Sequence, residues 1–205
     1  PAVTTIHRKG KCSHGMGHAL TYVSGYDLEI ALRECGRFSS KPLEYYCAGG
    51  AFMEYDIARG RADANAKPLH YPCDVYIEFP SACYPHKIKH LIKKLGSEEN
   101  VITECLGLDG FSEVGCFHGI GFVNGDDVEK NPLTIRDICT QGTYEDQYVC
   151  LHGAIVKLAE VNEEKASAVC ALLEGEKRTM CEELVRLGPY SLERPFEIYF
   201  ATERK

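Results

Sequence analysis

The chain has 205 residues, of which 44% are hydrophobic and 26% are charged, a composition typical of one globular domain or two small ones. This composition excludes a disordered or collagen-like chain, and no stretch reaches the roughly 18 consecutive apolar residues that a membrane-spanning helix needs. Thirty acidic residues against 23 basic ones give a net charge of -7. Because such a surface repels phosphate backbones, we expect no nucleic-acid partner.

The chain contains 11 cysteines, which is unusual for a protein of the reducing cytosol. We therefore expect an extracellular, periplasmic or secretory-pathway location. The sequence starts at Pro1 without a signal peptide, as expected for a mature or excised piece of a longer precursor.

Every second cysteine recurs at intervals of 31 to 36 residues, at Cys12, Cys47, Cys83, Cys116, Cys150 and Cys181. A near-constant period in this range predicts stacked helical hairpins. In chain order, we expect the first helix of each hairpin to cover about 12–24, 43–57, 82–95, 113–123, 146–160 and 177–188.

The remaining cysteines indicate the second helix of each hairpin. A good helix N-cap stands eight residues before four of them, at Asp27, Ser97, Asn131 and Asn162. We expect these helices over about 27–37, 97–106, 132–140 and 162–173, and an irregular segment near 65–79, where prolines disfavour a helix. Turns are expected at Ser24-Gly25, Gly96-Ser97 and Asn124-Gly125.

The pattern as a whole predicts an all-α fold of about five to six helical hairpins, arranged as a solenoid or a compact superhelix. The repeat domain would cover residues 1–188, and residues 189–205 would form an extended C-terminal tail.

The cysteine spacing favours disulfides over metal binding or redox chemistry. No two cysteines lie closer than ten residues, whereas structural zinc sites and redox sites use close pairs such as C-x-x-C. Bridges from each second helix to the next hairpin would pair Cys35 with Cys47, Cys73 with Cys83, Cys105 with Cys116, Cys139 with Cys150, and Cys170 with Cys181. Buried free thiols are the alternative. This pairing leaves Cys12 over, because its partner would belong to a preceding hairpin.

This layout of bridged hairpins resembles disulfide-bridged Sel1-like and TPR-like α/α repeat proteins. The resemblance covers most of the chain and rests on the period and the hairpin form, since the Leu-Gly-x-x-Tyr consensus pattern is not found. It implies an architecture of stacked helical hairpins.

Histidines recur near the cysteines of the first helices. His14 and His18 lie four residues apart and so share one helix face, a spacing that lets two imidazoles hold one metal ion. Glu54 interrupts an apolar run and is expected to face the same helix. His118 and His152 are candidates to complete the site. Two histidines with a carboxylate suit zinc or iron, and further imidazoles suit copper. Hydrogen bonds to carbonyl groups, and a salt bridge for Glu54, are the structural alternatives.

Two further patterns leave alternatives open. Glycine recurs three residues after the cysteine at Gly15, Gly50, Gly119 and Gly153, which indicates close helix packing or the approach of a ligand. His86 and His90 have the same spacing as the first pair, but Lys87 and Lys89 beside them indicate a solvated face.

The sequence carries no nucleotide-binding fingerprint and no C-x-x-C-H motif for covalently attached haem. Two functions remain. The first is a secreted or periplasmic domain that binds copper, zinc or iron, with oxidative or hydrolytic chemistry. The second is a non-catalytic scaffold whose concave face binds a protein or peptide.

Overall fold

The computed structural model describes residues 2–38, 40–161 and 163–187, and this part of the chain is helical, with no β-strand among its residues. The all-α prediction is confirmed. The α-helices are α1 (Ala2–Val23), α2 (Leu28–Cys35), α3 (Lys41–Tyr55), α4 (Arg61–Ala66), α5 (Pro80–Leu95), α6 (Glu98–Cys105), α7 (Gly110–Lys130), α8 (Tyr144–Val161), α9 (Glu163–Cys170) and α10 (Gly175–Leu187). A π-helical turn, Asp56–Gly60, and a 3₁₀ turn, Pro132–Arg136, interrupt the series. Within these ranges, no helix combines the length and hydrophobicity needed to cross a membrane.

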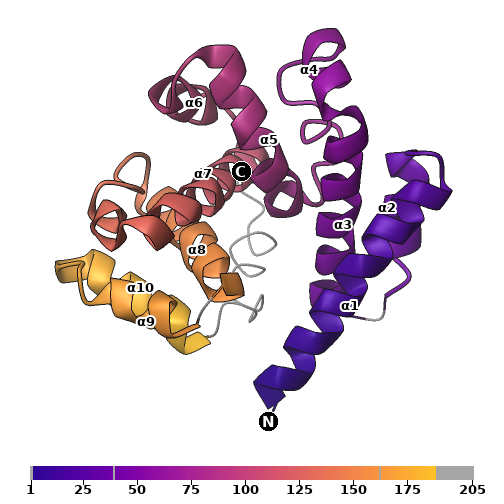
Figure 1. Cartoon of the computed structure of the whole chain (residues 1–205). Coiled ribbons are helices and arrows are strands. Elements are labelled where there is room, and N and C mark those ends of the chain that lie inside the picture. Colours follow the sequence, from indigo (N-terminus) through magenta and orange to yellow (C-terminus); the bar gives the residue numbers. More distant parts are fainter. Residues whose placement is uncertain (1, 39, 162, 188–205) are drawn as a thin grey trace.

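The long helices pack in chain order. The largest contacts join α7 to α8, α1 to α3 and α5 to α7, and α3 also contacts α5. The short helices α2, α6 and α9 each contact the long helix before them and the helix that follows. Figure 1 shows α1 and α2 at one side of the molecule and α9 and α10 at the other, with α3, α5, α7 and α8 between them. One hydrophobic core extends from Leu28 in α2 to Leu184 in α10.

All five predicted disulfides are present, namely Cys35–Cys47, Cys73–Cys83, Cys105–Cys116, Cys139–Cys150 and Cys170–Cys181. Their Cα–Cα distances of 5.4 to 5.7 Å lie in the normal range. Each bridge ties the end of a short helix or loop to the next long helix, and each closed loop contributes roughly 2–4 kcal/mol of stability. Cys12 is free and exposed. Five bridges indicate an oxidising, extracellular-type environment.

Three of the predicted helix caps are confirmed. Asp27 accepts a hydrogen bond from the Ile30 backbone N–H, and Ser97 accepts one from the Asn100 backbone N–H. Asn131 caps a 3₁₀ turn, where the sequence predicted an α-helix over 132–140. The fourth predicted cap, Asn162, and the predicted tail, 189–205, lie outside the described residues.

The turn predicted at Asn124-Gly125 is wrong, because α7 continues through both residues to Lys130. The Asn124 side-chain amide donates a 2.8 Å hydrogen bond to Glu98, so it is held by tertiary structure. Gly125 packs against the side chain of Lys157. Tertiary contacts therefore outweigh the local turn preference of this dipeptide.

Glycines let the backbones of α1 and α3 touch. A Cβ atom on Gly17 would overlap the carbonyl oxygen of Cys47, and one on Gly50 would overlap the carbonyl oxygen of His14. The Ser13 hydroxyl adds a hydrogen bond to a backbone carbonyl of α3. The close-packing interpretation is therefore correct for Gly50 but wrong for Gly15, whose Cβ position has no atom within 4 Å.

The same contact recurs between α7 and α8. A Cβ atom on Gly121 would overlap the carbonyl oxygen of Cys150, and one on Gly153 would overlap that of His118. Each of these residues stands 103 or 104 positions after its counterpart in the α1–α3 contact. The two helix pairs thus use corresponding positions to make the same backbone contact.

We expect a thiol count to confirm the bridges in solution. In denaturant without reductant, alkylation should label the single thiol of Cys12. After reduction, alkylation should label all 11 cysteines. The number of labels is read from the intact mass of the protein. A protein that takes up several labels before reduction would contradict the pairing.

The glycine contacts predict opposite effects for two neighbouring substitutions in α1. Gly17→Ala should destabilise the protein by about 3 kcal/mol, because its methyl group meets backbone that has no room to move. Gly15→Ala is the matched control, since no atom lies within 4 Å of its Cβ position. It should stabilise the protein by up to about 1 kcal/mol. Urea denaturation measures both, and equal effects would contradict the packing account.

Candidate functional site

Helices α1 and α3 bring together three of the residues predicted to form a site. His14 and His18 lie one turn apart on α1, with their ring centroids 4.9 Å apart. The His18 Nδ1 atom lies 2.9 Å from the Glu54 Oε2 atom on α3. The His18 Nε2 atom lies 3.2 Å from the His14 Nε2 atom. The side chains of His18 and Glu54 are 29% and 23% exposed, so solvent reaches the group.

The surroundings fix which ring nitrogens carry protons. A carboxylate only accepts hydrogen bonds, so His18 Nδ1 is the donor to Glu54. The His14 ring hydrogen-bonds the backbone of Tyr46, and its Nδ1 atom faces α3 beside Gly49. With both Nδ1 atoms committed to α3, the two Nε2 lone pairs face each other. Their 3.2 Å separation fits a hydrogen bond when one Nε2 atom is protonated, or two lone pairs that converge on one metal ion beside them.

Burial and the charge of His18 lower the pKa of His14 below its ordinary value, and the hydrogen bond to Tyr46 opposes this shift. His14 therefore favours the neutral form, which is the form that ligates a metal.

Helices α7 and α8 bring His118 and His152 together, with ring centroids 5.3 Å apart. Both side chains are buried. Burial lowers the pKa of His152 to about 4. Burial, followed by the charge of His152, holds the pKa of His118 well below its ordinary value. Both imidazoles are therefore neutral at pH 7.

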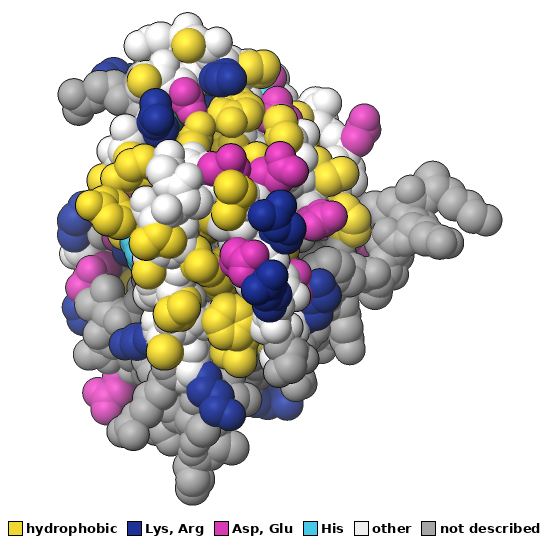
Figure 2. Space-filling model, turned by 90° about the vertical axis from the view of Figure 1, so that its right-hand side faces the viewer, with side chains coloured by type: hydrophobic (Ala, Val, Ile, Leu, Met, Phe, Trp, Pro, Cys, Tyr) yellow, Lys and Arg dark blue, Asp and Glu magenta, His cyan; other side chains and the backbone are white. Residues whose placement is uncertain are grey.

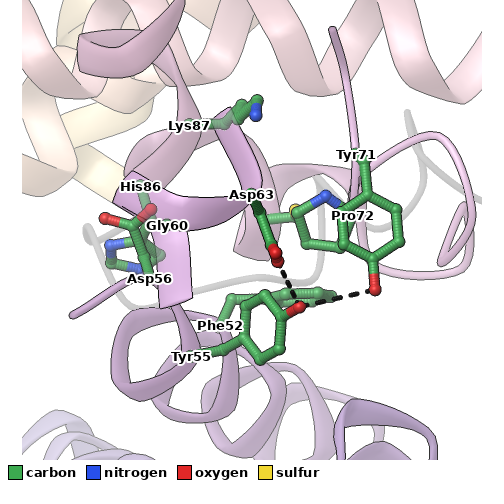
Figure 3. A pocket seen from close by; sticks show the side chains of 10 residues that line it. Phe52, Tyr55, Asp56, Gly60, Asp63, Tyr71, Pro72, His86 and Lys87 are labelled. Atoms are coloured by element: carbon green, nitrogen blue, oxygen red, sulfur yellow. Dashed lines mark hydrogen bonds between the residues drawn. The ribbon is translucent and has the colours of Figure 1, made fainter. Parts of the chain in front are cut away.

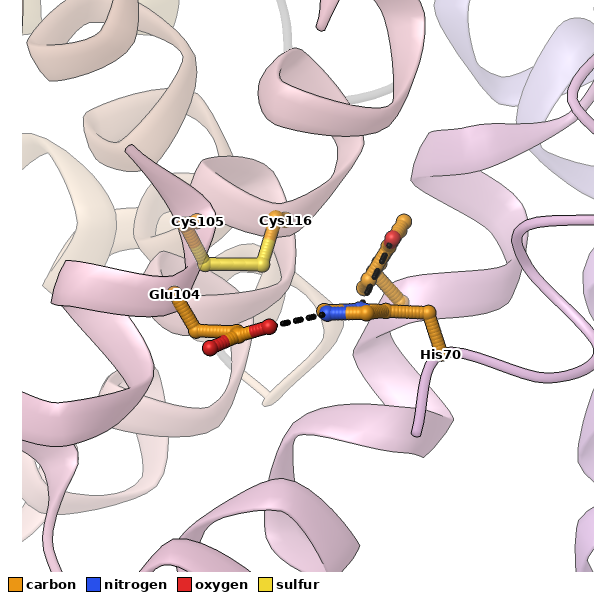
Figure 4. The surroundings of a disulfide bond; sticks show 5 residues. His70, Glu104, Cys105 and Cys116 are labelled. Carbon is orange, nitrogen blue, oxygen red and sulfur yellow. Dashed lines mark hydrogen bonds and ion pairs between the residues drawn. A yellow bond between two sulfur atoms is a disulfide. The ribbon is translucent and has the colours of Figure 1, made fainter. Parts of the chain in front are cut away.

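His152 differs from most buried polar groups, because neither of its ring nitrogens has a hydrogen-bond partner among residues 2–38, 40–161 and 163–187. Leaving such a group unsatisfied costs about 1–3 kcal/mol. His70 shows the usual arrangement (Figure 4). Its ring lies 3.2 Å from the Tyr84 hydroxyl and 3.4 Å from Glu104, beside the Cys105–Cys116 bridge. His70 is thus a satisfied structural histidine.

A cavity of about 740 Å³ connects the two helix pairs and is lined by residues of α1, α3, α5, α7 and α8. Its volume lies in the usual range for small-molecule sites. Five histidines line it: His14, His86, His90, His118 and His152.

The interpretation of His86 as part of a solvated face is wrong. Its side chain lines the cavity, and burial lowers its pKa to about 3, with the charges of His14 and His18 acting in the same direction. The neighbouring Lys87 is buried as well. One signal was present in the sequence, since His86 stands three residues after Cys83, at the position of the glycines that pack against a neighbouring helix in α3, α7 and α8.

His90, the second residue of that pair, lies 2.8 Å from Asp56, a carboxylate of the π-helical turn. Beside it is a smaller pocket of about 10 Å³, the space of about one water molecule. Figure 3 shows its lining, where the Tyr55 hydroxyl donates to Asp63 and lies 3.4 Å from the Tyr71 hydroxyl. This pocket is too small for an organic ligand.

The face formed by α1 and α2 carries no large patch of one charge. Figure 2 shows acidic and basic side chains interspersed with hydrophobic ones there. Exposed hydrophobic side chains of these two helices include Met16, Tyr22, Val23 and Ile30.

The predicted site residues thus form two groups, His14 with His18 and Glu54, and His118 with His152. Within residues 2–38, 40–161 and 163–187, no three His, Cys, Asp or Glu side chains are arranged to hold a metal ion. Glu54 contacts the ring of His18 on the side away from the facing Nε2 atoms, so it can orient this ring but does not itself face the second imidazole.

Comparison with known proteins gives no relative, since no family model, curated protein or solved structure matches the chain. The resemblance to Sel1-like and TPR-like repeats therefore stays a prediction about architecture.

The neutral buried histidines predict acid sensitivity. Above pH 6.5, His152 is neutral in both the folded and unfolded states. Below pH 6.5, His152 is protonated in the unfolded chain, whereas in the folded protein it stays neutral down to about pH 4. Stability should therefore fall between these values, by about 1.4 kcal/mol per pH unit for each such group. Between pH 7 and pH 5, the free energy of unfolding measured by urea denaturation should fall by roughly 1–2 kcal/mol less in His152→Leu than in wild type. If the free energy of unfolding falls equally with pH in both proteins, the prediction is contradicted.

Proposed function

We propose that this chain is a disulfide-stabilised helical domain that binds a divalent transition-metal ion between the Nε2 atoms of His14 and His18. The supporting observation is their 3.2 Å separation with both Nδ1 atoms turned toward α3. Two imidazoles on one tetrahedral zinc ion, at Zn–N distances of 2.0–2.1 Å, have nitrogen atoms about 3.3 Å apart. The pair therefore has the spacing of two ligands on one ion.

The contact between Glu54 and His18 also supports the proposal. Histidines that ligate metals usually donate their other N–H to a carboxylate or a carbonyl group, which fixes the tautomer and orients the ring. His18 has the carboxylate of Glu54, and His14 has the backbone of Tyr46. The negative charge of Glu54 also offsets part of the charge of a divalent ion.

Two protein ligands leave coordination positions for water or a substrate, because the pair is open to solvent. A zinc ion in such a position would activate water for hydrolysis, and a copper or iron ion would support oxidative chemistry. The proposed location is extracellular, periplasmic or in the lumen of the secretory pathway, because five disulfide bridges persist in an oxidising compartment.

Zinc titration by calorimetry tests this function. It should use protein made without a histidine tag and carrying Cys12→Ser, because a free thiol beside His14 is a competing zinc ligand. We expect one equivalent of Zn²⁺. His14→Ala and His18→Ala should each weaken binding at least tenfold, and Glu54→Gln should weaken it by about 10- to 100-fold.

His90→Ala is the matched control, because this histidine pairs with Asp56 and lies outside the proposed site. It should bind Zn²⁺ like the parent protein. The proposal is overturned if Zn²⁺ does not bind at 1 mM, or if removal of both His14 and His18 leaves the affinity unchanged in a protein with wild-type circular dichroism.

A further inference from the structure

The cavity that connects the two helix pairs has a mostly apolar wall. Met53 of α3, Pro85 of α5, Phe122 and Val123 of α7, and Val156 of α8 contribute to it. At about 740 Å³, the cavity has room for a small organic molecule. Such a wall favours the hydrocarbon part of a ligand, because apolar surface leaves water when the ligand binds.

The charged side chains that line the cavity are paired with one another. Asp56 lies 2.8 Å from the Nε2 atom of His90. Asp126 lies 3.4 Å from the Lys89 ammonium group and 3.5 Å from that of Lys157. Among the residues that the structure describes, the lining thus contains two carboxylates and two ammonium groups, whose formal charges cancel. A ligand with a net charge would lack a counter-charge here, so the cavity favours an uncharged molecule.

His86 of α5 provides a hydrogen-bond acceptor in this apolar space. Its side chain lines the cavity, and its ring forms a hydrogen bond with the backbone of Gly49 in α3. Because that bond acts to raise the pKa of His86, the ring N–H donates it and the Gly49 carbonyl group accepts it. Burial nevertheless keeps the ring neutral at pH 7, and a neutral imidazole has one N–H and one lone pair. The second ring nitrogen therefore carries the lone pair.

The second nitrogen of His86 differs from the ring nitrogens of His152. Both nitrogens of His152 are enclosed by protein, so a ligand in the cavity does not reach them. No nitrogen of His86 is enclosed and unsatisfied in this way, and the residue as a whole is only partly buried. Within the described part of the chain, the bond to Gly49 is the hydrogen bond that the His86 ring makes. A donor on a ligand is the natural partner for the remaining lone pair.

We propose that the cavity binds an uncharged organic molecule with an apolar body and one hydroxyl group. The hydroxyl group donates a hydrogen bond to the second ring nitrogen of His86, and the hydrocarbon body contacts Met53, Phe122 and Val156. His14 lines the cavity as well as belonging to the proposed metal site, but binding of the organic molecule does not require the metal ion.

A matched series of pyrene derivatives tests the proposal, with EDTA present so that no metal ion takes part. The protein is titrated into a low concentration of the probe, and the pyrene fluorescence is followed. 1-Pyrenemethanol should bind with a dissociation constant below about 100 μM. Pyrene-1-carboxylate and 1-pyrenemethylammonium carry a charge on the same apolar body. Each should bind at least tenfold more weakly, because the cavity offers no unpaired counter-charge.

The methyl ether of 1-pyrenemethanol isolates the hydrogen bond to His86. The ether has no donor, so it should bind to the wild-type protein about three- to tenfold more weakly than the alcohol. In His86→Leu the acceptor is absent, so the alcohol and the ether should bind with equal affinity. This ratio compares two ligands on the same protein, so a loss of stability in His86→Leu does not produce the same result.

Val156→Trp tests whether the probe binds inside the cavity, because the larger side chain takes up part of its volume. It should weaken binding of 1-pyrenemethanol at least tenfold in a protein with wild-type circular dichroism. Val75→Trp is the matched control, since Val75 is 57% exposed and is not among the residues that line the cavity. It should bind 1-pyrenemethanol like wild type.

Four results would overturn the proposal. These are no binding of 1-pyrenemethanol at 1 mM protein, binding of either charged derivative as tight as that of the alcohol, an unchanged ratio of alcohol to ether in His86→Leu, and unchanged binding in Val156→Trp. Because EDTA removes metal ions, failure of zinc binding at His14 and His18 leaves all four outcomes unaffected.

Discussion

Direct contact between helix backbones is the constraint on which the rest of the structure depends. Gly17 and Gly50 bring α1 and α3 together, and Gly121 and Gly153 do the same for α7 and α8. In both pairs a backbone oxygen of a histidine lies in the contact: that of His14 against Gly50 and that of His118 against Gly153. The positions of these two imidazoles relative to the neighbouring helix are therefore set by backbone packing, which is far less adaptable than side-chain packing.

Disulfides join three of these four helices, α3, α7 and α8, to the segments that precede them. Each connects a long helix to the short helix or loop before it, at a cysteine two residues before a cavity histidine in α7 and α8. In the chain-entropy model such bridges destabilise the unfolded chain more than they add contacts to the folded one. This matters here because the fold keeps unsatisfied and facing imidazoles inside, which cost stability. We infer that the bridges offset the cost of maintaining these groups.

Much of this fold was predictable from local signals. The cysteine spacing predicted an all-α fold and all five bridges, and Asp27, Ser97 and Asn131 predicted where the following helical segments begin. The predictions were wrong where contacts with residues distant in the sequence determine the local structure. Asn124 and Gly125 have turn propensity, yet Glu98 and Lys157 hold them in a helix. His86 looked solvated beside its lysines, because the sequence does not show that α5 faces a cavity.

The sequence predicted which residues of α1 and α3 lie together, but not which contact each of them makes. Helical spacing placed His14 and His18 on one face, and the register of α3 placed Glu54 near them. Only the structure shows that Glu54 contacts the outer nitrogen of His18, so that it fixes the orientation of this ring and does not itself face the second imidazole. The exchange of Glu54 for Lys157 at the corresponding position also becomes visible only once the two helix pairs are compared.

The central claim is that locked helices hold two imidazoles at the spacing of ligands on one metal ion. X-ray absorption spectroscopy at the zinc edge, on protein loaded with one equivalent of Zn²⁺, tests it most directly. The account predicts two imidazole nitrogen ligands at about 2.0–2.1 Å, with oxygen atoms completing the coordination shell. A spectrum with no imidazole, with three or more imidazoles, or with a sulfur ligand from Cys12 would contradict it.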